Sequence, residues 1–285
     1  MLAKRVVCCL AFCALLFCLP NLATAETQHT NLAFVNMGVG LEGLLYYEYV
    51  EISPVRSSAI TGSFVTALDA VVRWRQLGLL ARGNLTPATF GGDENWYSNG
   101  SLIQENDLSY RLRRGVAAVG FVLPGGLEPY LGYWYAKGTQ SRKDFRPSSP
   151  GLDIAIERIR SQGIVMGLQG VFHDGEKRSL IHFYGDLMII PGNDPIRAVT
   201  TNSLFSGLKF HSGGIGFESG GSYGWTIGNG QAKLLTSLQG NFIVLYYDGQ
   251  IRQDIPGLIV EWPSNLTVGF SLMLQLGGGW FSVLE

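Results

Sequence analysis

The clearest pattern in the chain is a two-residue alternation near its C-terminal end. From Leu266 to Phe281, one set of alternate positions carries mainly leucine, valine and phenylalanine, and the other set carries mostly small or polar residues. Successive side chains of a β-strand point to opposite faces. We therefore predict a strand over 266–281 with one apolar face and one polar face.

The same alternation recurs along most of the chain and is interrupted at regular intervals. Short turns are expected near 70–73 and at 124–126, 174–177 and 228–230, and longer loops at 87–106, 139–156, 191–202 and 248–265. Between them we predict strands over 32–50, 58–69, 75–86, 108–123, 127–138, 164–172, 179–190, 203–224, 234–246 and 266–281.

Alternating short and long connections and an even strand number are typical of outer-membrane barrels. The sequence thus predicts an all-β fold, a transmembrane antiparallel up-and-down β-barrel of ten strands, with eight or twelve strands as alternatives. Five tryptophans lie near predicted strand ends, where interfacial aromatic girdles belong: Trp74, Trp134, Trp225, Trp262 and Trp280.

A soluble periplasmic sandwich or lipocalin-like barrel is the competing fold. In that fold the apolar faces would point inward, and their large side chains would overfill a lumen of ten strands. Turned outward into lipid, the same faces are compatible with a closed sheet in which every backbone group is paired. The pattern therefore favours the membrane barrel.

The N-terminus has the three parts of a secretory signal. Lys4 and Arg5 precede the apolar run 6–19, and Ala23-Thr24-Ala25 forms a small-residue cleavage site. We predict cleavage after Ala25, a single barrel domain over 26–285, and export to the outer membrane of a Gram-negative cell. All four cysteines lie inside residues 1–25, so the predicted mature chain has no disulfide or thiol chemistry.

Composition narrows the functional classes further. Removing residues 1–25 takes away two basic residues and no acid, which changes the formal net charge from −1 to −3. No basic excess points to nucleic acid, and we expect neither a cofactor nor a metal. The expected partners are outer-membrane lipid and lipopolysaccharide, together with the periplasmic chaperones and the barrel-insertion machinery.

The polar faces of the predicted strands should line the lumen. Acids and bases occur there in similar numbers, which predicts a salt-bridge network filling a narrow barrel, because buried charges persist only when paired. A narrow conducting pore is the alternative. The predicted lumen residues are Glu42, Glu48, Asp69, Arg75, Arg82, Arg111, Arg113, Glu128, His182, Tyr184, Asp186, Lys209 and His211.

Few residues are candidates for catalysis. His182 and Asp186 share a strand face, and a histidine oriented by a carboxylate is half of a general-base arrangement. His211-Ser212 resembles the His-x-Ser motif of outer-membrane esterases, the phospholipase A and lipid A deacylase enzymes. Adjacent strand residues point to opposite faces, however, so His211 and Ser212 depart from that motif.

The ten-strand layout, the mature length and the segment Asp93-Glu94-Asn95-Trp96 resemble the omptin family of outer-membrane proteases. Omptins carry an Asp-x-Asp pair followed by Trp in this loop and an Asp-x-His pair in a later one. Asp93 matches the first aspartate, while Asn95 replaces the second and Ile196 follows Asp194 where histidine is expected. The resemblance implies the barrel architecture with incomplete catalytic pairs; related ten-strand adhesins bind ligands through their loops.

These observations lead to one hypothesis with two alternatives. The first is a non-enzymatic barrel, structural or narrow-pore, with extracellular loops available for binding. The alternatives are a surface adhesin and an omptin-like protease or other surface hydrolase, for which Asp93, His182 and Asp186 are the candidate catalytic residues.

Overall fold

The computed structural model describes residues 30–51, 53–148, 152–174, 177–192, 195–201, 206–255 and 258–283. The predicted signal sequence and Asp194 lie outside these residues. Within them, no helix is long and apolar enough to cross a membrane.

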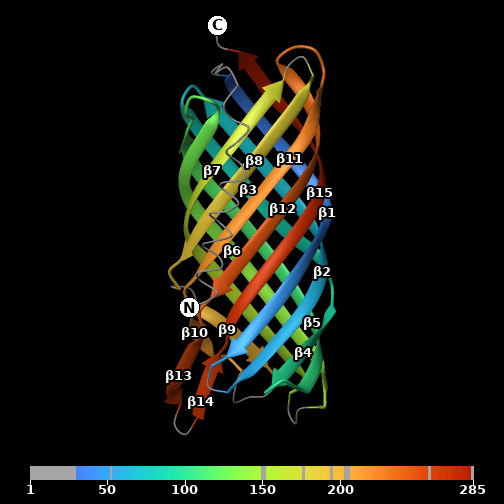
Figure 1. The fold of residues 1–285 in the computed structure, drawn as a ribbon, viewed down its shortest axis with the longest axis vertical. Coiled ribbons are helices and arrows are strands. Elements are labelled where there is room, and N and C mark those ends of the chain that lie inside the picture. The colour runs from blue at the N-terminus through green and yellow to red at the C-terminus, as the bar shows by residue number, and fades with distance from the viewer. Residues whose placement is uncertain are drawn as a thin grey trace.

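Ten long strands form a closed antiparallel ring, and β15 pairs with β1 to close it (Figure 1). The prediction of ten strands is confirmed. The ring contains β1 (Thr30–Val50), β2 (Val55–Trp74), β3 (Leu77–Phe90), β5 (Ser101–Phe121), β6 (Leu127–Arg146), β7 (Ile154–Asp174), β8 (Ser179–Ile190), β11 (Gly214–Ile227), β12 (Ala232–Tyr247) and β15 (Ser264–Val283).

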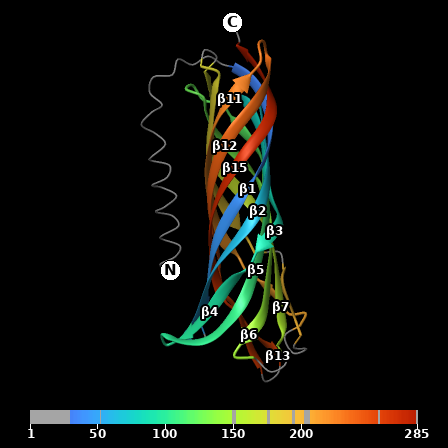
Figure 2. The same cartoon turned by 90° about the vertical axis from the view of Figure 1, so that its right-hand side faces the viewer.

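Five further strands gather at the end of the barrel opposite the C-terminus (Figures 1 and 2). We call them the extension: β4 (Gly92–Ser98), β9 (Pro195–Thr200), β10 (Lys209–His211), β13 (Gln250–Ile255) and β14 (Leu258–Trp262). β4 pairs with β2 and β5, β9 pairs with β7 and β10, and β13 pairs with β14. β4, β9 and β10 therefore continue the hydrogen-bonded sheet of the barrel wall, whereas β13 and β14 form a separate two-stranded sheet.

The extension corrects the predicted long loops. Residues 87–106 form the end of β3, all of β4 and the start of β5, not a loop. Asn99 and Gly100 have φ values of 49° and 84°, which fits an Asn-Gly hairpin turn between β4 and β5. Much of 139–156 likewise belongs to β6 and β7, and the first short turn lies at 75–76, where Arg75 has φ 55°.

The outer surface of the ring is apolar, as the alternation predicted. On the paired strands β1 and β15, Met37 and Leu274 are each 68% exposed, and their neighbours of the same parity are also exposed. The opposite parity of β1 places Phe34, Leu44 and Tyr46 in the buried core. The lumen therefore contains a substantial apolar core between its polar side chains, which the sequence reading did not anticipate.

The tryptophans divide between two environments. Trp74, Trp225 and Trp280 are exposed at the strand ends near the C-terminal side of the barrel, as expected for an interfacial girdle. Trp134 and Trp262 are buried, so their assignment to a girdle is wrong. Both lie at alternate strand positions whose side chains point inward.

Candidate functional site

The lumen is crossed by buried ion pairs that join strands on different sides of the ring. Each arginine in them is nearly inaccessible to solvent, and so are most of the carboxylates. Buried charges are stable in such a place only when they are paired and hydrogen-bonded. The pairs are Arg73–Glu128, Arg82–Asp186, His182–Asp69, Arg114 with Glu42 and Glu218, and Arg142 with Glu48, Glu94 and Glu157.

These groups occupy successive levels of the barrel. Arg73 lies near the C-terminal side, where its guanidinium also donates to the carbonyls of Val171 and Gly126. In the middle, Arg82 donates to Asp186 at 2.6 Å and stacks on the ring of Tyr184, 3.7 Å from its centroid. The ion-pair levels therefore interrupt the lumen repeatedly along its length.

Little space remains between the levels. The cavity around Arg82, Asn84 and Arg114 encloses about 10 Å³, which is about the volume that one water molecule's centre requires. The space among these three side chains is therefore too small for more than about one water molecule.

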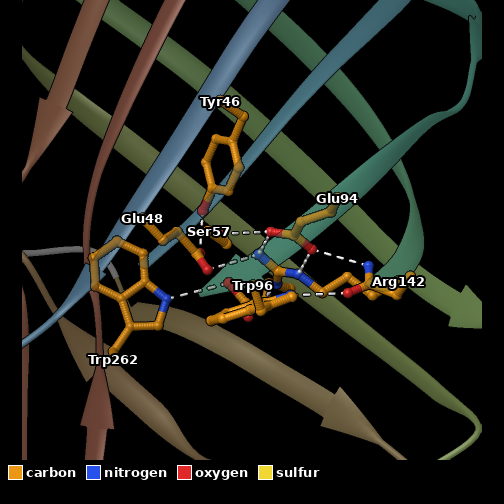
Figure 3. A network of polar contacts seen from close by, with 9 residues as sticks. Tyr46, Glu48, Ser57, Glu94, Trp96, Arg142 and Trp262 are labelled. Atoms are coloured by element: carbon orange, nitrogen blue, oxygen red, sulfur yellow. Dashed lines mark hydrogen bonds and ion pairs between the residues drawn. The ribbon is translucent and has the colours of Figure 1, made fainter. Parts of the chain in front are cut away.

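Among the described residues, the largest group of ion pairs lies at the end that carries the extension and is centred on Arg142 of β6 (Figure 3). We call it the Arg142 cluster, which contains Arg142, Glu48, Glu94 and Glu157. The guanidinium contacts Glu48 at 2.9 Å, Glu94 at 2.7 Å and Glu157 at 2.7 Å. Because these acids come from β1, β4 and β7, one side chain ties three elements to β6.

Neighbouring side chains complete the Arg142 cluster. Tyr46 donates to Glu48, Ser57 donates to Glu94 at 2.8 Å, and the indole of Trp262 donates to Glu157 at 3.3 Å. The guanidinium lies 5.6 Å from the ring centroid of Trp96 (Figure 3). β4 is therefore attached to the wall through side chains as well as backbone, and β14 contacts it through the Trp262 side chain.

Glu94 shows the electrostatic balance at this site. It belongs to β4, which lies outside the ten-strand wall, and it is fully buried. Burial raises its pKa, but the Arg142 guanidinium and hydrogen bonds from Arg142, Asn106 and Ser57 lower it more, so its pKa lies below the usual value. Glu94 is held as a carboxylate.

The structure places most of the predicted lumen residues in these networks. Glu42, Glu48, Asp69, Arg82, Glu128, His182, Tyr184 and Asp186 are all buried inside the ring. Asn106, Gln169 and Asn241 contribute further buried amides to the same interior.

Five predicted lumen residues are elsewhere. Arg111 and Arg113 lie exposed on the outer face of β5, and Arg114 faces the lumen instead. Arg75 is in the turn after β2, with Arg73 as the inward arginine. Lys209 and His211 are exposed on β10, beyond the wall. In each case the strand parity or boundary differs from the one predicted.

The candidate catalytic residues do not come together. Asp93 is 74% exposed and contacts Arg146 at 3.4 Å, whereas the adjacent Glu94 points inward. His182 contacts Asp69 at 3.0 Å and Asp186 contacts Arg82, both within the buried lumen. The Ser212 hydroxyl donates to backbone carbonyls, and His211 is exposed. Among the described residues, no group of three or more potential ligands could hold a metal ion.

The chain has the fold of an outer-membrane β-barrel. Its structure matches that of the outer-membrane protease OmpT from Escherichia coli with a TM-score of 0.59 and 10% identity, over 92% of this chain and 100% of that one. The outer-membrane protein OprG from Pseudomonas aeruginosa matches with a TM-score of 0.36 and 10% identity, over 90% and 98%. No family model and no curated protein matches the sequence.

Sequence reasoning missed the side chains that organise the barrel. Arg73, Arg114 and Arg142 each pair with at least one buried acid, but none was assigned to the lumen. The predicted loops 87–106 and 139–156 contain Glu94 and Arg142. The signal available in the sequence was parity: Arg111 and Arg113 share alternate positions with Val119 and Phe121, which are apolar and face outward.

Proposed function

We propose that this protein is a closed, non-conducting outer-membrane barrel that anchors the extension and presents it for binding. The observation that carries the proposal is the series of buried ion pairs across the lumen. A pore would leave these side chains hydrated, whereas here each buried arginine is in contact with at least one carboxylate. The proposal includes removal of residues 1–25 and insertion from the periplasm by the barrel-insertion machinery.

The Arg142 cluster supports the anchoring part of this proposal. It connects the extension to the wall through buried, charge-assisted hydrogen bonds, which are stronger than neutral ones. The extension is thereby held in one arrangement on a rigid support, which lowers the entropy lost when it binds a partner. An adhesin or other surface-binding protein uses such an arrangement.

Planar-bilayer recording tests the closure. Purified protein reconstituted into a bilayer should give no single-channel steps, and a conducting porin inserted by the same procedure serves as the positive control. Reproducible steps whose conductance is unchanged by substitutions in the ion pairs would contradict the proposed closure.

A surface hydrolase is the second candidate, because the structure that matches with a TM-score of 0.59 is a protease and Asp93 lies on the extension. The geometry does not support it: Asp93 contacts an arginine, and His182 is bound within the lumen. Incubation with basic peptides should therefore give no cleavage. Cleavage that Asp93→Ala abolishes would favour the hydrolase instead.

A further inference from the structure

The outer face of the barrel carries a group of cations where lipid is expected. Arg111 and Arg113 of β5, Lys137 of β6 and Arg158 of β7 are exposed on adjacent strands. In the sheet register Arg113 lies opposite Lys137, and Arg111 and Arg158 lie on either side of Thr139. We call these four residues the outer cationic site.

The site is a groove and includes hydroxyl groups. A hollow of about 340 Å³ is lined by the four cations together with Ser109, Thr139, Ser141 and Ile156. Guanidinium and ammonium groups donate strong hydrogen bonds to phosphate, and hydroxyls can add further ones. The chemistry of the groove therefore suits a phosphorylated ligand.

The protein itself does not neutralise these charges. None of the four side chains forms an ion pair with another residue that the structure describes. The nearby acids are engaged elsewhere: Glu157 points to Arg142, and Asp107 pairs with Lys143 and Arg146. Unpaired cations on a lipid-facing strand are destabilising at the membrane midplane and much less so near the interface, so an anionic partner or an interfacial position is required.

The depth of the site agrees with an interfacial position. β5 ends at Phe121 on the C-terminal side of the barrel. With a rise of about 3.3 Å per residue and a tilt of about 40°, Arg113 lies about 20 Å and Arg111 about 25 Å above Phe121. The apolar band of such barrels is about 25 Å tall. The cations therefore lie where the headgroups of the outer leaflet begin.

We propose that the outer cationic site binds the phosphate groups of an anionic glycolipid of the outer leaflet, of the lipopolysaccharide type. On the same three strands, six positions from Arg113, Lys137 and Arg158 toward the C-terminal side of the barrel, Val119, Leu131 and Ile164 are exposed and would contact the acyl chains of that lipid. A free phosphate would not use this apolar surface. The glycolipid proposal requires insertion into the membrane, but it does not require a closed lumen. A barrel that conducts ions and still binds glycolipid would contradict only the proposed function.

The test uses the purified barrel in phosphatidylcholine nanodiscs, titrated with a bisphosphorylated lipid A glycolipid and followed by native mass spectrometry. The variant Arg111→Gln with Arg158→Gln should weaken binding at least about tenfold, because two charge-assisted contacts are lost. The matched control, Arg75→Gln with Lys177→Gln, removes two exposed charges from turns at the opposite end of the barrel and should change binding less than about twofold.

Competitors identify the source of the phosphate. Inorganic phosphate at millimolar concentration should not displace the glycolipid, and dephosphorylated glycolipid should bind weakly. Three results would each overturn the proposal. They are equal loss of binding in both double variants, displacement of the glycolipid by inorganic phosphate, and equally tight binding of phosphatidylglycerol. Retention of the heat-dependent gel shift of a folded barrel is the folding control; if the double variant does not fold, the single variants Arg111→Gln and Arg158→Gln carry the test.

Discussion

At the scale of single residues, a change of one position decides whether a charge stabilises or destabilises this barrel. Arg113 and Arg114 are neighbours in the sequence, but Arg113 lies on the outer face and Arg114 pairs with Glu42 at 2.8 Å in the lumen. The alternation alone shows that two faces exist. Which face an arginine occupies depends on the parity of the larger apolar residues on the same strand.

Arg142 gives the strongest prediction at this scale. Arg142→Gln would leave two buried carboxylates and one partly buried carboxylate without their cation, and removing one partner of a buried pair typically costs about 3–5 kcal/mol. Urea unfolding of the protein in lipid vesicles should show a decrease of this size. Lys143→Gln, at an exposed neighbouring position, should stay within about 0.5 kcal/mol; equal effects of both substitutions would show that the Arg142 cluster contributes little.

Glu94 predicts how the extension responds to acid. Its pKa is lowered in the folded protein, so its contribution to stability is complete above the unfolded-state pKa of about 4.3 and is lost as the pH falls through the folded-state value. Thermal unfolding between neutral and acidic pH should therefore show a steeper loss for the wild type than for Glu94→Gln. Parallel curves for the two proteins would contradict this assignment.

At the scale of elements, the strands extend further than the membrane requires. Most of the residues in the predicted long loops belong to strands. The closing strand is an example: β15 continues past the predicted end at Phe281, and Ser282 and Val283 pair with β1. Its apolar face points outward as predicted, and its seam with β1 is paired along its length.

The seam between β1 and β15 contains a glycine that the packing requires. A Cβ on Gly40 would lie 2.0 Å from the carbonyl oxygen of Leu272, while a Cβ on Gly43 of the same strand would meet nothing within 4 Å. Gly40→Ala should therefore destabilise the barrel by about 1–3 kcal/mol, as overpacking does. Unfolding in urea checks this, with Gly43→Ala as the matched control; indistinguishable stabilities would show that the seam can shift to accept the methyl group.

At the scale of the whole molecule, the fold separates three environments. The outer face is apolar, the lumen is filled by core side chains and ion pairs, and the extension lies at one end (Figures 1 and 2). If the barrel is inserted as proposed, the extension faces outside and the turns near the C-terminus face the periplasm.

Cysteine labelling checks this orientation, since the four natural cysteines all lie within residues 1–25. In intact cells, Asp93→Cys on the extension should react with a membrane-impermeant maleimide, because residue 93 is highly exposed. Lys177→Cys, in the turn after β7, should react only after the outer membrane is permeabilised. Met37→Cys on the outer face should stay unlabelled in both. Labelling of Lys177→Cys in intact cells would contradict the proposed orientation.

The sequence by itself determined the all-β class, the ten strands and the apolar outer face, because the alternation of side chains is a local property of each strand. It also placed residues such as Glu42, Arg82 and Asp186 on inward faces. Only the tertiary structure decided which acid each arginine meets, because Arg142 and Glu94 come from segments far apart in the chain and their contact depends on sheet register. The four cations of the outer cationic site likewise form a group only when β5, β6 and β7 are aligned.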